Sequence, residues 1–402
     1  MPNAENPKAK KTSKKQKNEK KETVKLEGFD YPLLVLSLSI LAFGLIMVQS
    51  AGAFKSFNEN DANVYYYLFQ QLKWAGLGIL AAGIIAFVPY TFWRRFAGLG
   101  ILITLVLLMM VRYSDVSMSG GGAARWLKIL GFSVQPSEIA KLCSALFLAH
   151  VFDRYPLQNL KALCVPGVLI ALMLALIYKQ PDLGTTIVLA ATCAAMIWQT
   201  GLASKWFFIA GPPVVMMVAV FVYKTEYQWK RILVWLDPWK YAVDEGYQVT
   251  NAAIAFGTGG LFGLGLGESV QKYGALPENH TDYIFAIVGE ELGLLGCLIL
   301  ITLFAALFFR SYQLARCCPD RFGRLLAFGL TTSLAIQTTV NMAVVTGVFP
   351  TTGITLPFIS YGGSSLLITL AQVGILLNIS RYRTEKQRVK VWEKGNLTVS
   401  NE

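Results

Sequence analysis

The sequence predicts an all-α polytopic membrane protein, and three observations lead to this fold class. Hydrophobic residue types make up 54% of the 402 residues and charged types only 15%, whereas soluble domains carry about 25% charged residues. The mean hydropathy is +0.48. Long apolar runs without charges recur along the whole chain. These features exclude a disordered chain, a disulfide-rich secreted scaffold and an ordinary cytosolic enzyme.

Ten apolar runs approach the length of about 20 residues that a helix needs to cross a bilayer. They lie at 31–52, 72–90, 96–113, 136–152, 162–179, 184–200, 205–223, 282–309, 324–349 and 363–380. Several of these runs are short or interrupted by Gly and Pro. The sequence therefore predicts ten transmembrane helices, with boundaries that are good to a few residues.

The basic residues predict that both termini lie in the cytoplasm. The net charge is +12, and Lys and Arg gather in the two tails and in the loops that ten spans place on one side. About twice as many Lys and Arg residues fall on that side as elsewhere, which agrees with the positive-inside rule. The positive charge therefore indicates topology and contact with anionic lipid headgroups, not binding of nucleic acid.

The chain divides into three predicted parts. Residues 1–30 form a basic cytoplasmic tail that we expect to be disordered, 31–381 form the membrane domain, and 382–402 form a second cytoplasmic tail. Two outer loops are long, at 114–135 and 224–281. Because the second is rich in Trp, Tyr and Gly, we expect it to be folded and to place its tryptophans at the membrane interface.

Ionisable residues inside or beside the spans cluster on the predicted outer side. They are Arg125, Glu138, Lys141, Lys179, Asp182, Asp282, Glu290 and Glu291. Charged groups at membrane depth are costly and therefore indicate function. A structural role is the alternative for Glu290 and Glu291, and for the Glu138–Lys141 pair on one helix face. The six Cys and two His residues have no metal-site spacing.

Two classes of protein fit this pattern. One is a transporter, in which charged groups line a pathway through the bundle. The other is a membrane enzyme that acts on a lipid-linked substrate at the outer surface. A transporter needs access from both faces, whereas these charged groups crowd one side of the predicted bundle. The one-sided distribution favours the enzyme.

Four motifs, taken in order along the chain, resemble the SEDS family of peptidoglycan polymerases. They are GAARWL at 122–127 with QPSEIAK at 135–141, QPDLGT at 180–185, LPENHTDYIFA at 276–286 and PTTGITLPFISYGGSS at 350–365. The resemblance runs from residue 30 to residue 382 and includes the ten spans. Gly289 before the paired glutamates, together with Phe358 and Ser364, is more similar to division-type than to elongation-type members.

The resemblance implies polymerisation of lipid II into β-1,4 glycan strands at the outer face of the cytoplasmic membrane, during septal wall synthesis. A single displacement inverts the α-linked donor, so one general base suffices, and the matching motif gives this role to Asp282. The departing diphosphate needs cations, for which the candidates are Arg125, Lys141 and Lys179. The expected supporting residues are Glu138, Asp182, Gln135, Gln180, Glu290 and Ser360.

The resemblance also implies partners and a cofactor. A class B penicillin-binding protein would crosslink the new strand, and other division proteins would switch the complex on at the septum. A divalent cation, Mg²⁺ or Mn²⁺, is expected with Glu138 or Asp182 as ligands. Four alternatives stay open: a lipid II flippase, an elongation-type polymerase, a scaffold of the division machinery, and Asp282 as a mere N-cap of the eighth span.

Overall fold

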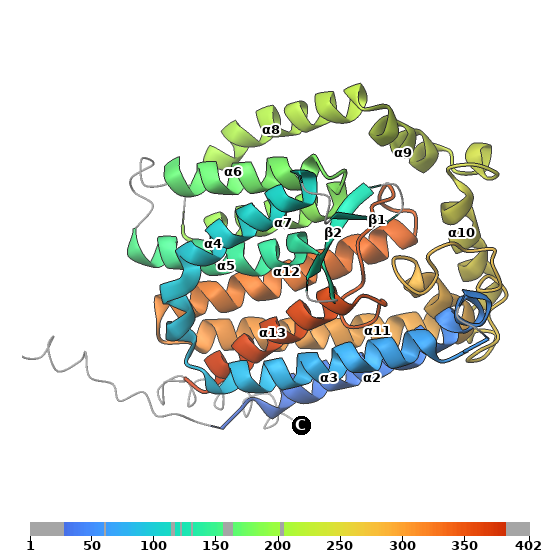
Figure 1. Cartoon of the computed structure of the whole chain (residues 1–402), viewed down its shortest axis with the longest axis horizontal. Helices are drawn as coiled ribbons and strands as arrows, with labels where there is room; N and C mark the ends of the chain where they lie inside the picture. Colours follow the sequence, from blue (N-terminus) through green and yellow to red (C-terminus); the bar gives the residue numbers. More distant parts are fainter. Residues whose placement is uncertain are drawn as a thin grey trace, which may run out of the picture.

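A helix covers most of each of the ten predicted spans in the computed structural model (Figure 1). The structure describes residues 28–59, 62–113, 117–120, 123–129, 132–155, 164–201 and 205–382. The ten matching helices are α2 (Tyr31–Glu59), α3 (Tyr66–Phe87), α4 (Tyr90–Tyr113), α5 (Pro136–Arg154), α6 (Cys164–Tyr178), α7 (Leu183–Gln199), α8 (Lys205–Lys224), α11 (Ile284–Cys317), α12 (Arg321–Val345) and α13 (Gly363–Ser380).

The prediction of a helical, multi-pass membrane protein is confirmed. Within the described residues, α2, α3, α4, α11, α12 and α13 are each long and apolar enough to span a bilayer. The helices α6 and α7 are apolar but shorter, with 15 and 17 residues. Helix α5 carries Glu138 and Lys141 near its start, which lowers its hydropathy.

The two described ends of the chain lie together at one end of the bundle (Figure 1). The Asp30 amide donates to Ser380 Oγ at 3.1 Å, and the Arg381 guanidinium lies 5.0 Å from the centre of the Phe29 ring. Arg310 Nη2 pairs with Asp30 Oδ2 at 2.7 Å. Of the two predicted tails, residues 1–27 and 383–402 lie outside the described part of the chain.

Helices α12 and α13 form the centre of the bundle. Of the residues in the most apolar stretch of each helix, 83% are buried in α13 and 61% in α12, compared with 22% in α3. Helix α3 packs on α13, α11 packs on α12 and α2, and α4 packs on α5. The polar groups of α12, which include Gln337 and Asn341, are therefore surrounded by protein rather than by lipid.

The segment between α4 and α5, which the sequence predicts as the first outer loop, contains a small antiparallel sheet that the all-α prediction missed. Its strands are β1 (Ser117–Gly120), β2 (Ala123–Ile129) and β3 (Phe132–Val134), in the order β1-β2-β3. Leu127 pairs with Ser117 on one side and with Val134 on the other. The register shifts between Met118, which pairs with Trp126, and Ser119, which pairs with Ala124, so Arg125 is the extra residue of a β-bulge.

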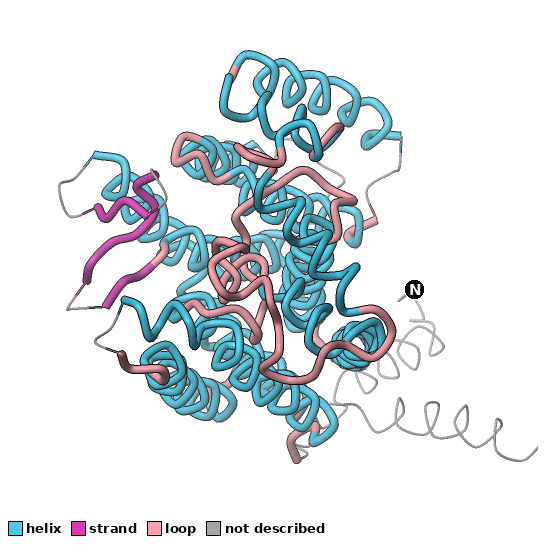
Figure 2. Tube along the Cα trace, turned by 90° about the vertical axis from the view of Figure 1, so that its right-hand side faces the viewer, coloured by secondary structure: helices cyan, strands magenta, loops and turns pink. Residues whose placement is uncertain are grey.

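The segment between α8 and α11, which the sequence predicts as the second outer loop, contains short helices. These are α9 (Glu226–Leu236), the 3₁₀ turn η2 (Trp239–Tyr241) and α10 (Tyr247–Gly259). Trp235 donates its Nε1 proton to the Gly347 carbonyl at 3.0 Å, which ties α9 to the loop after α12. Figure 2 faces this end of the bundle and shows the strands at one side and irregular loops over the centre.

The glycine-rich run after α10 fits against a break in α11. Gly293 has φ 65° and ψ −165°, which interrupts the helix. The interruption leaves backbone groups of α11 without helical partners. The glycine-rich run supplies these partners: the amides of Leu264 and Gly265 donate to the carbonyls of Glu290 and Glu291 at 3.0 Å each, and the Gly260 carbonyl accepts from the Leu294 amide.

The paired glutamates Glu290 and Glu291 hold the same loop through their side chains. Glu291 accepts hydrogen bonds from Ser50 Oγ at 2.6 Å and Lys272 Nζ at 3.1 Å. The Glu290 carboxylate accepts from the amides of Val270 and Gln271. Glu290 is thus a structural anchor for the segment that leads to Asp282 rather than a group of the cavity described below.

Removal of the Lys272 charge is expected to destabilise the protein strongly. The Lys272–Glu291 pair is 5% and 0% exposed, so Lys272→Met leaves a buried carboxylate without its cation. Loss of one partner of a buried pair costs about 3–5 kcal/mol of unfolding free energy. Thermal unfolding in detergent measures the effect. The matched control is Lys230→Met on α9, where the ion pairs are exposed and the loss should be far smaller. Equal losses would contradict this account.

Candidate functional site

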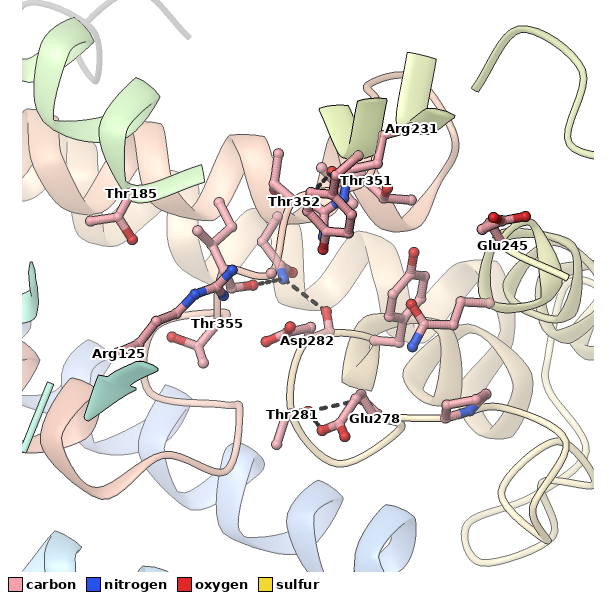
Figure 3. Close-up of a pocket in the computed structure, with 18 of the residues that line it drawn as sticks. Arg125, Thr185, Arg231, Glu245, Glu278, Thr281, Asp282, Thr351, Thr352 and Thr355 are labelled. Carbon is pink, nitrogen blue, oxygen red and sulfur yellow. Dashed lines mark hydrogen bonds between the residues drawn. The ribbon is translucent and has the colours of Figure 1, made fainter. Parts of the chain in front are cut away.

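A cavity of about 1180 Å³ lies at the end of the bundle away from the two chain ends. Its walls come from β2, the starts of α5 and α7, α9, α10, α12, the loop before α11 and the loop between α12 and α13. All four sequence motifs contribute side chains directly, the second of them through Thr185. The structure therefore brings segments that are far apart in the sequence to one concave surface (Figure 3).

Asp282 lies at the centre of this cavity. Helix α11 begins at Ile284 with Tyr283 in the N-cap position, and no side-chain cap is present. The alternative in which Asp282 caps the helix is therefore wrong. A methyl group built on Gly353 would lie 3.3 Å from Asp282 Oδ2 and 3.5 Å from Arg125 Nη1. Glycine at this position leaves the carboxylate and the guanidinium open to the same space.

Three successive backbone carbonyls hold the loop that carries Asp282. The His280 carbonyl accepts from the Tyr361 amide at 2.9 Å. The Thr281 carbonyl accepts from Ser360 Oγ at 2.6 Å, and the Asp282 carbonyl accepts from Asn341 Nδ2 at 2.9 Å. We call this arrangement the carbonyl clamp. It fixes the Asp282 backbone without using its carboxylate, and the predicted site residue Ser360 is one of its three donors.

A buried polar line connects the clamp to α5. Gln337, one turn before Asn341 on α12, donates Nε2 to the Thr355 carbonyl at 3.0 Å. Its Oε1 accepts from Lys141 Nζ, and Lys141 Nζ also bonds Glu138 Oε1 at 2.8 Å. Lys141 is 3% exposed and does not line the cavity, whereas Glu138 does. The contacts of Lys141 are those of a structural ion pair.

Arg125 is aimed into the cavity by two backbone carbonyls. Its Nε donates to the Gln180 carbonyl at 3.2 Å and its Nη2 to the Pro181 carbonyl at 2.6 Å. The Gln180 side chain in turn bonds the Leu108 carbonyl at 3.0 Å. These bonds leave Nη1 directed toward Gly353 and Asp282. The expected supporting residue Gln180 therefore acts through Arg125.

Three other predicted residues lie at the edge of the site or outside it. Asp182 caps α7 by accepting from the Thr185 amide at 3.0 Å, and Gln135 Nε2 reaches its other oxygen at 3.5 Å. Lys179 is exposed and does not line the cavity. Among the residues that the structure describes, no group of three or more His, Cys, Asp or Glu side chains is placed to hold a metal ion.

Arg231 on α9 is a site residue that sequence reasoning missed. Its Nη1 donates to the Thr351 carbonyl at 3.0 Å, and its guanidinium lies 4.5 Å from the centre of the Tyr227 ring. Figure 3 shows Asp282 between Arg125 and Arg231. The available signal was the i, i+4 spacing of Tyr227 and Arg231 within an outer segment that had been expected to fold.

The surroundings raise the pKa of Asp282 to about 7. Burial is the largest cause, because it disfavours the charged carboxylate. The nearby carboxylates of Glu278 and Asp182 raise the pKa further, and Arg125 and Arg231 lower it in part. An acid whose pKa lies near neutral pH can accept a proton from a substrate hydroxyl and release it again.

The chain is similar to proteins that make peptidoglycan. Residues 31–385 match the family described as cell cycle protein, FtsW/RodA/SpoVE. The chain is 40% identical over 364 residues to a probable peptidoglycan glycosyltransferase FtsW of Trichlorobacter lovleyi, covering 89% of this chain and 94% of that one. It is 40% identical to stage V sporulation protein E of Bacillus subtilis, over 90% of this chain and 99% of that one.

Two solved structures share the fold. One is a chain of a peptidoglycan synthase complex that coordinates polymerization and crosslinking, with a TM-score of 0.74, 29% identity, and coverage of 89% of this chain and 99% of that one. The other is the rod shape determining protein RodA of Thermus thermophilus, with a TM-score of 0.66, 28% identity, and coverage of 89% and 98%.

The raised pKa of Asp282 predicts a pH-dependent cost in stability. Because the folded state holds the Asp282 proton more tightly than the unfolded chain, this group lowers stability as the pH rises from about 4 to about 7. Asp282→Asn removes that cost. The variant should melt at a higher temperature than the wild type at pH 8, and the difference should shrink toward pH 5. Glu268→Gln, an exposed carboxylate of the preceding loop, is the control and should show no such trend.

Proposed function

The chain belongs to the FtsW/RodA/SpoVE family of cell cycle proteins, and we propose that it builds septal glycan strands from lipid II with Asp282 as the general base. It is a peptidoglycan glycosyltransferase. The observation that carries the proposed mechanism is the position of Asp282: a carboxylate with a pKa of about 7, open to a large cavity, with Arg125 beside it.

The proposed reaction is a single inverting displacement. The Asp282 carboxylate takes the proton of the acceptor sugar hydroxyl while that oxygen forms a bond to the donor's anomeric carbon. The bond from this carbon to the diphosphate oxygen breaks, and undecaprenyl diphosphate leaves with the electron pair. Because attack comes from the face opposite the leaving group, the α-linked donor gives a β-linked product. No second catalytic carboxylate is needed.

Arg125 is the proposed cation for the departing diphosphate. The carbonyls of Gln180 and Pro181 fix its guanidinium before the substrate arrives, and preorganised charge stabilises the transition state most effectively. Lys141 was expected to share this role. Its contacts with Glu138 and Gln337 support an indirect role instead, in which it holds α5 against α12. Lys179 is the weaker proposal, since it lies outside the cavity wall.

We propose Mg²⁺ or Mn²⁺ as a cofactor, with Glu138 and Asp182 as its protein ligands. The donor set fits only in part, because Glu138 Oε1 is bonded to Lys141 and Asp182 Oδ1 caps α7. Magnesium commonly binds one or two carboxylates together with substrate phosphates. The ion would neutralise charge on the diphosphate, while Arg125 and Asp282 keep the roles given above.

The proposed topology has ten membrane crossings, both chain ends in the cytoplasm and the cavity at the outer face. Support comes from the two chain ends, which lie together at one end of the bundle. Arginines gather at that end: Arg310 pairs with Asp30, and Arg94 lies over the Phe322 ring. Basic residues favour the cytoplasmic side.

The proposed location is the division septum of the cytoplasmic membrane, and the proposed partner is a class B penicillin-binding protein that crosslinks the product, together with other division proteins. The similarity to a chain of a complex that coordinates polymerization and crosslinking supports this partner, and the relatives named FtsW support the division role.

Substitution of Asp282 should abolish most polymerisation. Loss of a general base costs about 10²–10⁴-fold in rate, so Asp282→Asn should lose at least about 100-fold when purified protein, its transpeptidase partner, labelled lipid II and a divalent cation are combined. Because only the ionised base is active, the wild-type rate should rise with pH through about 7. Glu268→Gln, an exposed carboxylate of the preceding loop that does not line the cavity, is the control and should retain most of the activity.

Two results would contradict the proposal. Equal polymer from the wild type and a folded Asp282→Asn variant would remove Asp282 from the chemistry. Translocation of lipid II across liposomes by a wild-type protein that makes no polymer would indicate a flippase instead.

A further inference from the structure

Three buried side chains of the cavity wall carry a polar atom without a hydrogen-bond partner. Within the described chain, these atoms are the Tyr283 hydroxyl, Asn341 Oδ1 and Thr352 Oγ1, and all three residues line the cavity. The side chains are 4%, 1% and 3% exposed. An unsatisfied buried polar group costs about 1–3 kcal/mol, so three of them on one wall require an explanation.

The three residues surround one junction of the fold. Asn341 Nδ2 donates to the Asp282 carbonyl at 2.9 Å and to the Ile354 carbonyl at 2.7 Å. Tyr283 follows Asp282 in the chain, and Thr352 precedes Ile354 by two residues. In Figure 3, Thr352 lies above Asp282, and Arg125 approaches from the left. The three residues therefore belong to the segments that meet next to Asp282 in the cavity wall.

The chemistry of Asn341 restricts the ligand. Both of its amide protons are used by carbonyls, so the one polar atom of the side chain that is left for a ligand is the amide oxygen, which only accepts hydrogen bonds. A deprotonated diphosphate offers no donor. Sugar hydroxyls and acetamido N–H groups are donors, and the hydroxyls of Tyr283 and Thr352 can donate or accept. This set of groups matches a saccharide and does not match a phosphate.

We propose that Tyr283, Asn341 and Thr352 form a saccharide subsite, which binds the hydroxyl and acetamido groups of the sugar next to the bond that is made. The inference rests on the proposed function and deepens it. The proposed subsite divides the cavity into two parts. The sugar side lies where α12 meets the loop before α11 and the loop between α12 and α13, and the diphosphate side lies at Arg125. The bound sugar supplies the partners that the buried atoms lack in the free protein.

The subsite predicts an unusual pair of effects for substitutions that remove only the unpartnered oxygen. Tyr283→Phe and Thr352→Val keep the shape of the side chain. Each should leave the melting temperature unchanged or raise it, because no hydrogen bond is lost in the free protein. Each should weaken lipid II binding about threefold to tenfold, as expected for the loss of one hydrogen bond. The KM for lipid II should rise accordingly while kcat changes little.

The chain offers matched controls. The Tyr178 hydroxyl and Thr338 Oγ1 are also buried without a partner among the described residues, and neither residue lines the cavity. Tyr178→Phe and Thr338→Val therefore repeat the same chemical changes away from the proposed subsite. They should leave lipid II binding unchanged.

Binding of two probes to the full-length protein tests the assignment. Lipid II carries sugar and diphosphate, whereas undecaprenyl diphosphate carries no sugar. Tyr283→Phe and Thr352→Val should raise the Kd for lipid II and leave the Kd for undecaprenyl diphosphate unchanged. Because binding is measured without turnover, this result stands apart from the rate loss expected for Asp282→Asn, and either can fail alone.

Three outcomes would overturn the subsite. They are an unchanged Kd for lipid II, an equal rise for both probes, and a defect that disappears when the Mg²⁺ or Mn²⁺ concentration is raised. The second would assign the residues to the diphosphate, and the third would assign them to a cation. Equal effects in the Tyr178 and Thr338 controls would attribute the changes to general packing.

Discussion

The site depends on the carbonyl clamp of His280, Thr281 and Asp282. The loop before α11 has no regular ladder to satisfy its backbone, and buried carbonyls require partners. The partners come from Tyr361, Ser360 and Asn341. Because these donors lie on α12 and on the loop before α13, the loop that bears Asp282, the proposed general base, is held by the most buried part of the bundle. The carboxylate itself remains open to the cavity.

The clamp also explains why polar and charged groups are buried in the middle of a membrane protein. Lys141 and Glu138 are costly at this depth, yet through Gln337 they support the loop that contains Thr355. Arg125 depends on a second such support from the carbonyls of Gln180 and Pro181. Motifs that are separate in the sequence thus hold, through hydrogen bonds and one ion pair, the loops and the arginine that surround Asp282.

The helices could be predicted from the sequence, because long apolar runs are visible within a short stretch of the chain. The resemblance of their motifs singled out Asp282 and Arg125, and both residues line the cavity; the roles of the two residues are our proposals. The sequence did not reveal β1–β3, whose pairing depends on tertiary context. It indicated the pairing of Lys141 with Glu138 but did not reveal the second partner of Lys141, since Gln337 is far away along the chain. Arg231 was missed because its position depends on how α9 folds back over the cavity.

The clamp is tested most directly by steady-state polymerisation kinetics of Ser360→Ala. Ser360 does not line the cavity, so it acts as a positioning residue for Asp282. The account predicts that kcat falls about tenfold or more because the base is misplaced, that the KM for lipid II is unchanged, and that Ser360→Thr restores much of the rate. An unchanged kcat in a variant that has lost only thermal stability would contradict the central role of the clamp.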